Sequence, residues 1–392
     1  MNDNDHRGLL PTGLADILAP EAEFEATVTE SVMKLFSAYG YDRVKPPLIE
    51  FEETLLSGSD GAMAKQTFRM MDPISQRMLG VRADMTMQIA RIASTRLGDL
   101  PRPIRLSYAG QVLRIKGSDL RPKRQFGQIG AELIGSASPQ ADVEVVLMAA
   151  EALTNLGVPH LSVDLGLPTL VTAICTALEI DLSANSNNLR AALNQKNAPE
   201  IKMISKNFGA ETGALFGALI KAVGPADEAL AILQATKMPK EAACKLANLA
   251  EIITCIKDRA PNLTLTIDPT ETRGYEYHTG ATFTFFALNV KSEIGRGGRY
   301  LADDANCNSA PEAATGITLF VDSIMRALPK PPMPDKICVP ASTPEITLKL
   351  RKEGWAVVEY FDENQLDPEQ QANQSSCTYY WDGKQITPVT NS

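Results

Sequence analysis

The sequence predicts an α+β fold in which a mainly antiparallel sheet is flanked by helices. Amphipathic helical stretches surround clusters of strand-like segments along the chain. Two of these segments, residues 104–115 and 124–134, enclose a polar loop, and this pattern is typical of an antiparallel hairpin. With 392 residues, of which 44% are hydrophobic, the chain can bury a sizeable core over two or three domains.

Helices and short strands are predicted around this hairpin. Residues 22–39 carry apolar side chains at helical spacing, and Gly40 is suited to end that helix. Residues 41–45 alternate like a strand and are followed by two prolines, which end it. Beyond these, helices are expected over residues 85–97 and 140–156, and a short strand over 161–164.

The composition changes in the second half of the chain. Residues 183–257 are rich in alanine, leucine, lysine and asparagine, with periodic apolar positions and no strand signal, so we expect a helical insertion there. The elements expected after it are strands over 263–268 and 275–290 and a helix over 318–328. The glycine-rich run 295–300 could form a backbone nest for an anion, but a tight turn is favoured.

A proline-rich segment divides the chain near its end. Residues 329–334 read PKPPMP, which predicts a stiff extended linker. We therefore expect a core over residues 1–328 and a small C-terminal α/β segment over 335–392, built from a strand, a helix and a second strand. This segment is shorter than a full-sized independent domain.

Composition excludes several classes of protein. The formal charge of −9 argues against a main role in binding polyanions. No run approaches the length of a membrane helix, and the polar start MNDNDHRG predicts no signal peptide. The six cysteines form no C-x-x-C pattern and the three histidines lie far from them, so no metal site is expected. Reduced, mostly buried thiols in a cytoplasmic protein are the expectation.

Two segments carry residues suited to binding an anion or a small polar ligand. The expected hairpin loop holds five cations within eleven residues: Arg114, Lys116, Arg121, Lys123 and Arg124. Such a loop can aim several donors at a phosphate or carboxylate, although a solvated turn is favoured on charge alone. In the run Arg273-Gly-Tyr-Glu-Tyr-His-Thr-Gly280, a strand would place Arg273 and Tyr277 on one face. That wall suits a small polar ligand, but an ordinary amphipathic strand fits equally well.

Taken in order, these segments resemble the catalytic core of histidyl-tRNA synthetase, a class II aminoacyl-tRNA synthetase. YGYDRVKPPLIEF (39–51) is similar to the first motif of that family, residues 105–135 to the second, and TRGYEYHTG (272–280) to a signature of histidyl enzymes. GRGGRY (295–300) precedes the region of the third motif. The resemblance covers about residues 8–328 and implies a class II synthetase-like fold and self-association as a class II-type dimer.

The chain departs from a working synthetase in its third motif. The family pattern there is Gly-x-Glu-Arg, and its arginine holds the γ-phosphate of ATP. Here Phe320 stands at the glycine and Ser323 at the arginine. Serine cannot supply a planar charged fork, so charge stabilisation that adenylation needs is lost. In addition, residues 82–86 read Arg-Ala-Asp-Met-Thr where the synthetase has Arg-Pro-Glu, and the C-terminal segment is too short for an anticodon-binding domain.

These departures are typical of the synthetase paralogues that serve as regulatory subunits of ATP phosphoribosyltransferase. The resemblance implies a non-catalytic chain that partners the short-form catalytic ATP phosphoribosyltransferase subunit in a hetero-octamer. It implies a requirement in the first step of L-histidine biosynthesis and feedback control by histidine, with no catalytic residue, no cofactor and no tRNA. Two alternatives stay open: a histidyl-tRNA synthetase with an atypical third motif, and a histidine-binding paralogue with another partner.

The resemblance also implies a histidine-binding pocket. The matching residues are Asp84, Thr86 and Gln128 for the α-amino group, Arg114 and Arg273 for the carboxylate, and Glu132, Tyr277 and His278 for the imidazole. Paired guanidinium–carboxylate contacts are strong and directional. Asp84 is one methylene shorter than the usual glutamate, which predicts a looser or water-bridged contact. His278 replaces a second tyrosine of the family.

Overall fold

The computed structural model describes residues 9–56, 61, 63–118, 120–180, 189–271, 277–303, 310–361 and 367–390. It divides into two compact units. One is formed by residues up to 16 together with 25–330, and the other by residues 17–24 together with 331–392.

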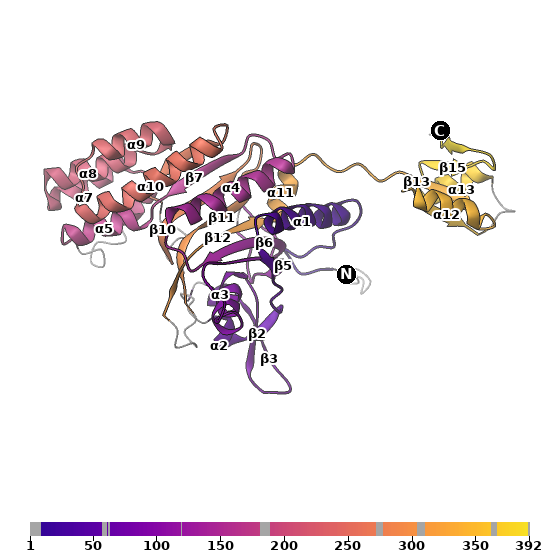
Figure 1. Cartoon of the computed structure of the whole chain (residues 1–392), viewed down its shortest axis with the longest axis horizontal. Coiled ribbons are helices and arrows are strands. Elements are labelled where there is room, and N and C mark those ends of the chain that lie inside the picture. The colour runs from indigo at the N-terminus through magenta and orange to yellow at the C-terminus, as the bar shows by residue number, and fades with distance from the viewer. Residues whose placement is uncertain are drawn as a thin grey trace, which may run out of the picture. The chain divides into compact units, whose positions relative to one another are not determined.

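A nine-stranded sheet forms the centre of the larger unit (Figure 1). Its order is β1 (Asp42–Arg43), β5 (Ile104–Leu113), β6 (Gln125–Ile134), β12 (Glu312–Phe320), β11 (Gly295–Ala302), β10 (His278–Phe286), β7 (Ser162–Gly166), β9 (Thr264–Asp268) and β8 (Gly224–Pro225). The pairs β1–β5 and β7–β9 are parallel, and the other neighbours are antiparallel. The α+β fold with a mainly antiparallel sheet is therefore confirmed, including the hairpin of β5 and β6.

Helices cover the two faces of this sheet. On one face α4 (Pro139–Asn155) and α11 (Val321–Ala327) pack against β6 and β12. α4 is buried on most of its surface and begins at Ser138, whose side chain accepts a hydrogen bond from the Gln140 backbone N–H. α3 (Thr86–Thr95) also packs against β6, and its apolar side chains join Leu106, Tyr108 and Phe126 in one buried cluster. One side of helix α1 (Glu21–Ala38) is buried, and Val32 and Phe36 lie on that side.

A three-stranded sheet projects beside α3. It contains β2 (Ile49–Phe51), β4 (Met78–Val81) and β3 (Phe68–Met71), with α2 (Glu52–Leu55) and η2 (Ala64–Gln66) next to it. Pairing of Phe51 with Leu79 and of Leu79 with Met70 places these three side chains on one face of the sheet. Ile49 and Phe68 lie on the same face, which is therefore almost wholly apolar.

Helices dominate the region in which a helical insertion is expected. The bounds there are α7 (Ala198–Ser205), η3 (Lys206–Phe208), α8 (Ala210–Lys221), α9 (Ala226–Ala235) and α10 (Lys240–Arg259). The two residues of β8 pair with β9 in this region, contrary to the expectation of no strand. α5 (Thr169–Ala177), which packs against α10, precedes it and was not predicted.

Two predicted elements are wrong. Residues 295–300 form the start of strand β11 rather than a tight turn, because the glycines allow close packing between β10 and β12. A Cβ at Gly297 would collide with the carbonyl oxygen of Gly316 on the neighbouring strand. The helix expected over 318–328 begins only at Val321, since β12 continues through Phe320.

The smaller unit forms a compact sheet of its own after the proline-rich segment. Its strand order is β14 (Ala356–Tyr360), β13 (Lys336–Pro340), β15 (Tyr379–Trp381) and β16 (Ile386–Pro388), with helices α12 (Pro344–Lys352) and α13 (Pro368–Gln374). Ile337 and Val339 pack with Leu350 on one side, whereas Cys338 packs with Ala372 on the other. β13 is thus buried on both faces.

Candidate functional site

Seven of the eight residues carried over for histidine binding lie in the described part of the chain. Asp84 and Thr86 stand where α3 begins, Arg114 directly follows β5, and Gln128 and Glu132 belong to β6. Tyr277 and His278 stand at the start of β10. The eighth residue, Arg273, lies outside the described residues. Elements far apart in the sequence therefore bring these side chains to the face of the sheet that α3 covers.

The end of the site predicted to hold an amino group is a hydrogen-bonded cluster. The Asp84 carboxylate accepts from the Thr86 backbone N–H at 2.8 Å and from Gln128 Nε2 at 3.0 Å. Gln128 Nε2 also donates to Thr318 Oγ1 at 3.1 Å. Gln128 Oε1 is buried and has no hydrogen-bond partner among the described residues. A buried acceptor of this kind suits an ammonium group, because leaving it unpaired is unfavourable.

The end predicted to hold the imidazole contains a buried carboxyl group between two tyrosines. Tyr108 Oη donates to Glu132 Oε1 at 3.0 Å, and Tyr300 Oη donates to Oε2 at 2.9 Å. All three side chains are at most 3% exposed. Burial raises the pKa of Glu132 to about 8, although both phenols oppose this shift. Glu132 is therefore a group that exchanges its proton close to neutral pH.

The two aromatic residues of the histidyl signature lie beside this carboxyl group. The rings of Tyr277 and His278 are 4.0 Å apart, and Tyr277 meets Tyr300 edge to face at 6.2 Å. His278 is buried whereas Tyr277 is half exposed. Together they form an aromatic wall that suits a flat ring next to Glu132.

Two glycines, Gly298 and Gly316, leave free space above the sheet between Glu132 and His278 because they carry no side chain. Gly316 pairs with Glu132 across β6 and β12, and Gly298 pairs with Gly316 across β11 and β12. A Cβ at Gly316 would collide with Glu132 Oε2, and one at Gly298 would lie 2.7 Å from His278 Cδ2. Gly298 also has a φ of +156°, which side chains rarely adopt. Glycine is therefore required at both positions to leave room between Glu132 and His278.

Arg114 reaches toward the same site. Its Nε donates to the Ala83 carbonyl oxygen at 3.2 Å, and its guanidinium lies 5.0 Å from the centre of the Phe126 ring. Burial lowers the pKa of Arg114 and the nearby Asp84 carboxylate opposes this shift. A partly buried guanidinium beside an ammonium-binding cluster is the arrangement that an α-amino acid needs.

Of the other cations of the hairpin loop, Arg121 lies near Arg114, since both guanidiniums face the Phe126 ring, at 5.7 and 5.0 Å from its centre. Arg121 is only 8% exposed, pairs with Glu293 at 2.8 Å and stacks 3.5 Å from the centre of the Phe320 ring. Arg124 donates to the carbonyl oxygens of Thr12 and Arg114. A wholly solvated turn is thus the wrong description of this loop, because Arg121 is held inside the protein.

The third-motif positions are filled with buried groups. Phe320 is 1% exposed and meets Phe126 edge to face at 6.0 Å. Ser323 is fully buried, and its hydroxyl lies 3.3 Å from Ser292 Oγ and accepts from Arg326 Nη2 at 3.0 Å. Arg326 also contacts Asp322. The guanidinium of Arg121 therefore faces the Phe320 ring and the Glu293 carboxylate.

Sequence reasoning missed several residues of this site. The residues that contact or shape it without having been predicted as ligand-binding are Tyr108, Gly298, Tyr300, Gly316 and Thr318. The sequence signals for them were the alternation of residues 104–115, the GRGGRY run and the third-motif region. Next to them on the same sheet face, a cavity of about 510 Å³ is lined by Asp164, Asp268, Thr282, Thr284, Glu293 and Arg296, among others.

Among the described residues no group of three or more histidine, cysteine or acidic side chains is placed to hold a metal ion. No helix in the described ranges has the length and hydrophobicity to cross a membrane. Cys175, Cys338 and Cys377 are buried, Cys244 is exposed, and all four are free thiols.

Comparison with known proteins identifies the family. Residues 13–324 match the family model described as histidyl-tRNA synthetase. The chain is 51% identical over 380 residues to an ATP phosphoribosyltransferase regulatory subunit of Paramagnetospirillum magneticum, covering 97% of each chain. It is 48% identical over 382 residues to a protein of the same name from Rhodospirillum centenum, covering 97% of this chain and 96% of the relative.

Solved structures share the fold. An ATP phosphoribosyltransferase regulatory subunit/histidyl-tRNA synthetase from Bacillus halodurans aligns with a TM-score of 0.81 at 22% identity, covering 94% of this chain and 96% of that one. A histidyl-tRNA synthetase from Nostoc sp. aligns with a TM-score of 0.77 at 18% identity, covering 95% and 90%. The class II synthetase-like fold is thereby confirmed. The chain belongs to the histidyl-tRNA synthetase family and, within it, to the ATP phosphoribosyltransferase regulatory subunits.

Proposed function

We propose that this chain binds the short-form catalytic subunit of ATP phosphoribosyltransferase in a cytoplasmic hetero-octamer, and that it binds free histidine and mediates feedback control of histidine biosynthesis. The observation that supports the proposal is the combination of a polar and aromatic cluster that suits an α-amino acid with a third motif that lacks its glycine and arginine. Gln128 and Glu132 offer acceptors to the ligand, while Phe320 and Ser323 take the place of the ATP-binding pattern.

The pocket matches the three polar groups of histidine. The ammonium would lie against Gln128 Oε1 and Asp84, and the carboxylate against Arg114, with Arg273 proposed as its second partner. The imidazole would lie between Glu132 and the Tyr277 ring. A feedback ligand must bind one conformation of the complex better than another, by about 1–3 kcal/mol in typical systems.

The absence of adenylation follows from the residues at the third motif. A synthetase needs a guanidinium on the γ-phosphate, and Ser323 offers only a buried hydroxyl that already contacts Ser292 and Arg326. A working synthetase is the weaker alternative for this reason. A histidine-binding paralogue with another partner would fail to assemble with the catalytic subunit.

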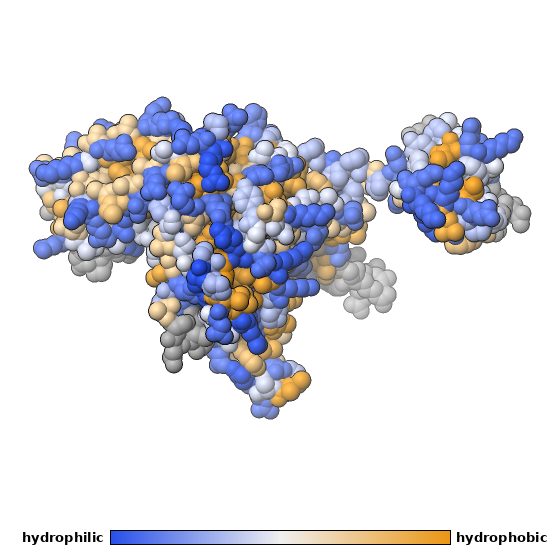
Figure 2. Space-filling view, in the orientation of Figure 1, coloured by the Kyte–Doolittle hydropathy of each residue, from blue (hydrophilic) through white to orange (hydrophobic). Residues whose placement is uncertain are grey.

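We also propose self-association through the three-stranded sheet. Its apolar face carries Ile49 and Met70, which are 38% and 42% exposed, and it continues into the segment 39–51 that resembles the family's dimer motif. Figure 2 shows hydrophobic atoms at the end of this projecting sheet, where Ile74 in the β3–β4 turn is 91% exposed. An apolar face of this kind is suited to burial against a second copy.

Mixing the purified chain with a short-form catalytic subunit is expected to produce a complex with phosphoribosyltransferase activity that neither chain has alone. Histidine is expected to inhibit that activity. The measurement is size-exclusion chromatography followed by a rate assay with and without histidine. Robust histidine-dependent ATP–pyrophosphate exchange by this chain alone, or no complex, would contradict the proposed function.

A pocket variant separates histidine sensing from assembly. Arg114→Ala is expected to raise the histidine concentration for half-inhibition about tenfold or more, because a charge-assisted contact is lost, while the complex still forms. Arg351→Ala is the matched control, since Arg351 forms an exposed ion pair with Glu359 in the smaller unit.

Met70→Asp is expected to convert the chain from dimer to monomer, because it places a charge in the proposed apolar interface. Sedimentation velocity at several protein concentrations measures this. Met203→Asp serves as control, because Met203 is 64% exposed on α7, away from that sheet. Equal dimerisation of both variants would show that the sheet face is not the interface.

A further inference from the structure

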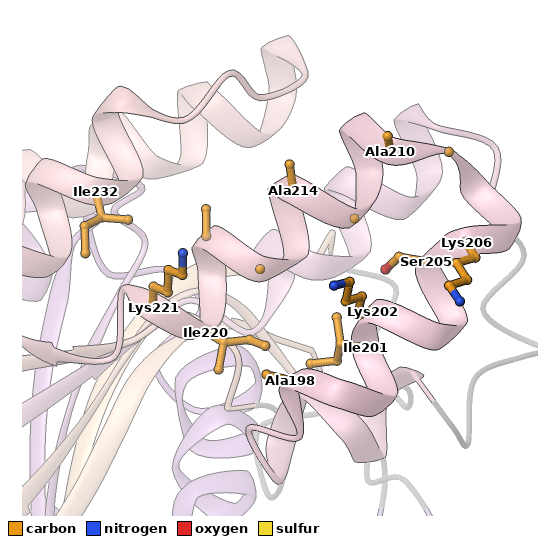
Figure 3. A pocket seen from close by; sticks show the side chains of 14 residues that line it. Ala198, Ile201, Lys202, Ser205, Lys206, Ala210, Ala214, Ile220, Lys221 and Ile232 are labelled. Carbon is orange, nitrogen blue, oxygen red and sulfur yellow. The ribbon is translucent and has the colours of Figure 1, made fainter.

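The helical insertion carries an open groove that the proposed histidine site does not use. It has a volume of about 830 Å³ and lies along α7 and α8, with Ile232 of α9 at one side (Figure 3). Its lining is apolar apart from Ser205 and three lysines. We propose that this groove binds an acidic amphipathic helix of a partner protein. This inference goes beyond the proposed function and does not depend on which enzyme the chain regulates.

The sequence of α8 gives the helix two different faces. Thr212, Leu215, Phe216 and Leu219 are buried and pack toward the rest of the insertion. The groove side carries a stripe of small residues at helical spacing, with Ile220 and Lys221 at its C-terminal end. The stripe consists of Ala210, Gly213, Ala214, Gly217 and Ala218. A stripe of small side chains lets another helix approach closely and lets its larger side chains fill the space. The stripe and Lys221 span twelve residues of α8, about 18 Å, which matches about three turns of a bound helix.

A buried polar group lies at the wall of the groove. Ser205 at the end of α7 lines the groove, is 2% exposed, and its hydroxyl has no hydrogen-bond partner among the described residues. Figure 3 shows the Ser205 side chain between α7 and α8. A Cβ built at Gly213 of α8 would lie 3.3 Å from Ser205 Cβ. An unpaired buried hydroxyl is unfavourable, so a polar side chain of the occupant would satisfy it.

Charge determines what kind of helix fits. Lys202, Lys206 and Lys221 line the groove, and no carboxylate does so in the described part of the chain. None of the three lysines forms an ion pair with a described residue. In a chain of net charge −9, this local positive rim selects an acidic partner. A flat bilayer surface would not enter a concave groove, whereas the ridge of an amphipathic helix would.

The experiment is a selection from a displayed library of amphipathic helical peptides, with the full-length chain as bait. Peptides that bind wild type but not Gly217→Leu are expected, and they are expected to be enriched in aspartate and glutamate. Gly217 suits this test because a Cβ there meets nothing within 4 Å, and leucine is a better helix former than glycine. The variant therefore fills the groove while the fold is retained, which a thermal melt checks.

Fluorescence anisotropy with the best selected peptide then measures affinity. Gly217→Leu is expected to weaken binding at least about tenfold, and Ser205→Ala about two- to tenfold. Ala247→Leu, on the exposed side of α10, is the matched control and should leave the affinity unchanged. Replacing the three lysines by glutamate should weaken the acidic peptide and favour its lysine-substituted counterpart. Selected peptides without acidic enrichment, or with equal affinity for Gly217→Leu and wild type, would overturn the proposal.

Discussion

Glu132→Gln is expected to make the larger unit more stable than wild type above neutral pH and to flatten the dependence of its stability on pH. In the folded chain burial raises the pKa of Glu132 to about 8 from the usual 4.5. Between these values the folded state holds a proton that the unfolded chain has released. The contribution of Glu132 to stability is therefore complete below pH 4.5 and falls as pH rises toward 8, by up to about 1.4 kcal/mol per pH unit. Glutamine stays neutral and removes this loss.

Urea unfolding at pH 5.5, 7.0 and 8.5 measures the effect. The difference in unfolding free energy between Glu132→Gln and wild type should grow in favour of the variant with rising pH. Glu144→Gln is the matched control with the opposite sign, because Arg105 lowers the pKa of Glu144 through a hydrogen-bonded ion pair at 2.7 Å. Removing the negative charge of Glu144 should lower the free energy of unfolding above pH 4.5. Parallel pH profiles for Glu132→Gln and wild type would mean that Glu132 is ionised throughout.

Glu132→Gln is also expected to change the pH dependence of histidine binding. A glutamine at position 132 still offers one acceptor oxygen to an imidazole N–H, but it carries no charge. Histidine affinity is therefore expected to lose its rise between pH 6.5 and 8, which deprotonation of Glu132 produces in wild type. Calorimetry at several pH values separates this effect from the change in stability.

Gly316→Ala is expected to destabilise the larger unit by about 3 kcal/mol and to abolish histidine binding. The added methyl group would collide with the Glu132 carboxyl group, which Tyr108 and Tyr300 hold in place at 3.0 and 2.9 Å. Overpacking costs about 1–3 kcal/mol, and the displaced carboxyl group would also lose buried hydrogen bonds. The midpoint of urea unfolding measures the change.

Two further variants test whether the loss of stability in Gly316→Ala comes from the collision with Glu132. Gly217→Ala makes the same substitution where the new methyl group meets nothing, so it should stabilise α8 slightly, by about 0.5–1 kcal/mol. In a Glu132→Ala background the collision is absent, so Gly316→Ala should cost much less than in wild type. Such coupling in a double-mutant cycle is expected for residues in direct contact. An equal cost in both backgrounds would place the strain elsewhere.

Local sequence patterns predicted the parts of the fold in which neighbours along the chain decide the structure. The α1 helix and the β5–β6 hairpin appear within a few residues of their predicted ends, since periodicity and turn residues act locally. The run 295–300 was misjudged because its glycines serve contacts across β10 and β12, not a turn. α5, α13 and β15 carry weaker periodic signals and were missed.

The sequence by itself determined the fold class, the family and the loss of the nucleotide motif, because residue types at fixed spacings carry that information. The replacement of the third-motif glycine and arginine by Phe320 and Ser323 can be recognised from the sequence alone. Only the tertiary structure decided that Glu132 lies between Tyr108 and Tyr300 with a raised pKa. The same is true of the Ser205 hydroxyl, which is buried beside the groove with no hydrogen-bond partner among the described residues. Burial and electrostatic environment depend on side chains that are far apart in the chain, and folding alone brings them together.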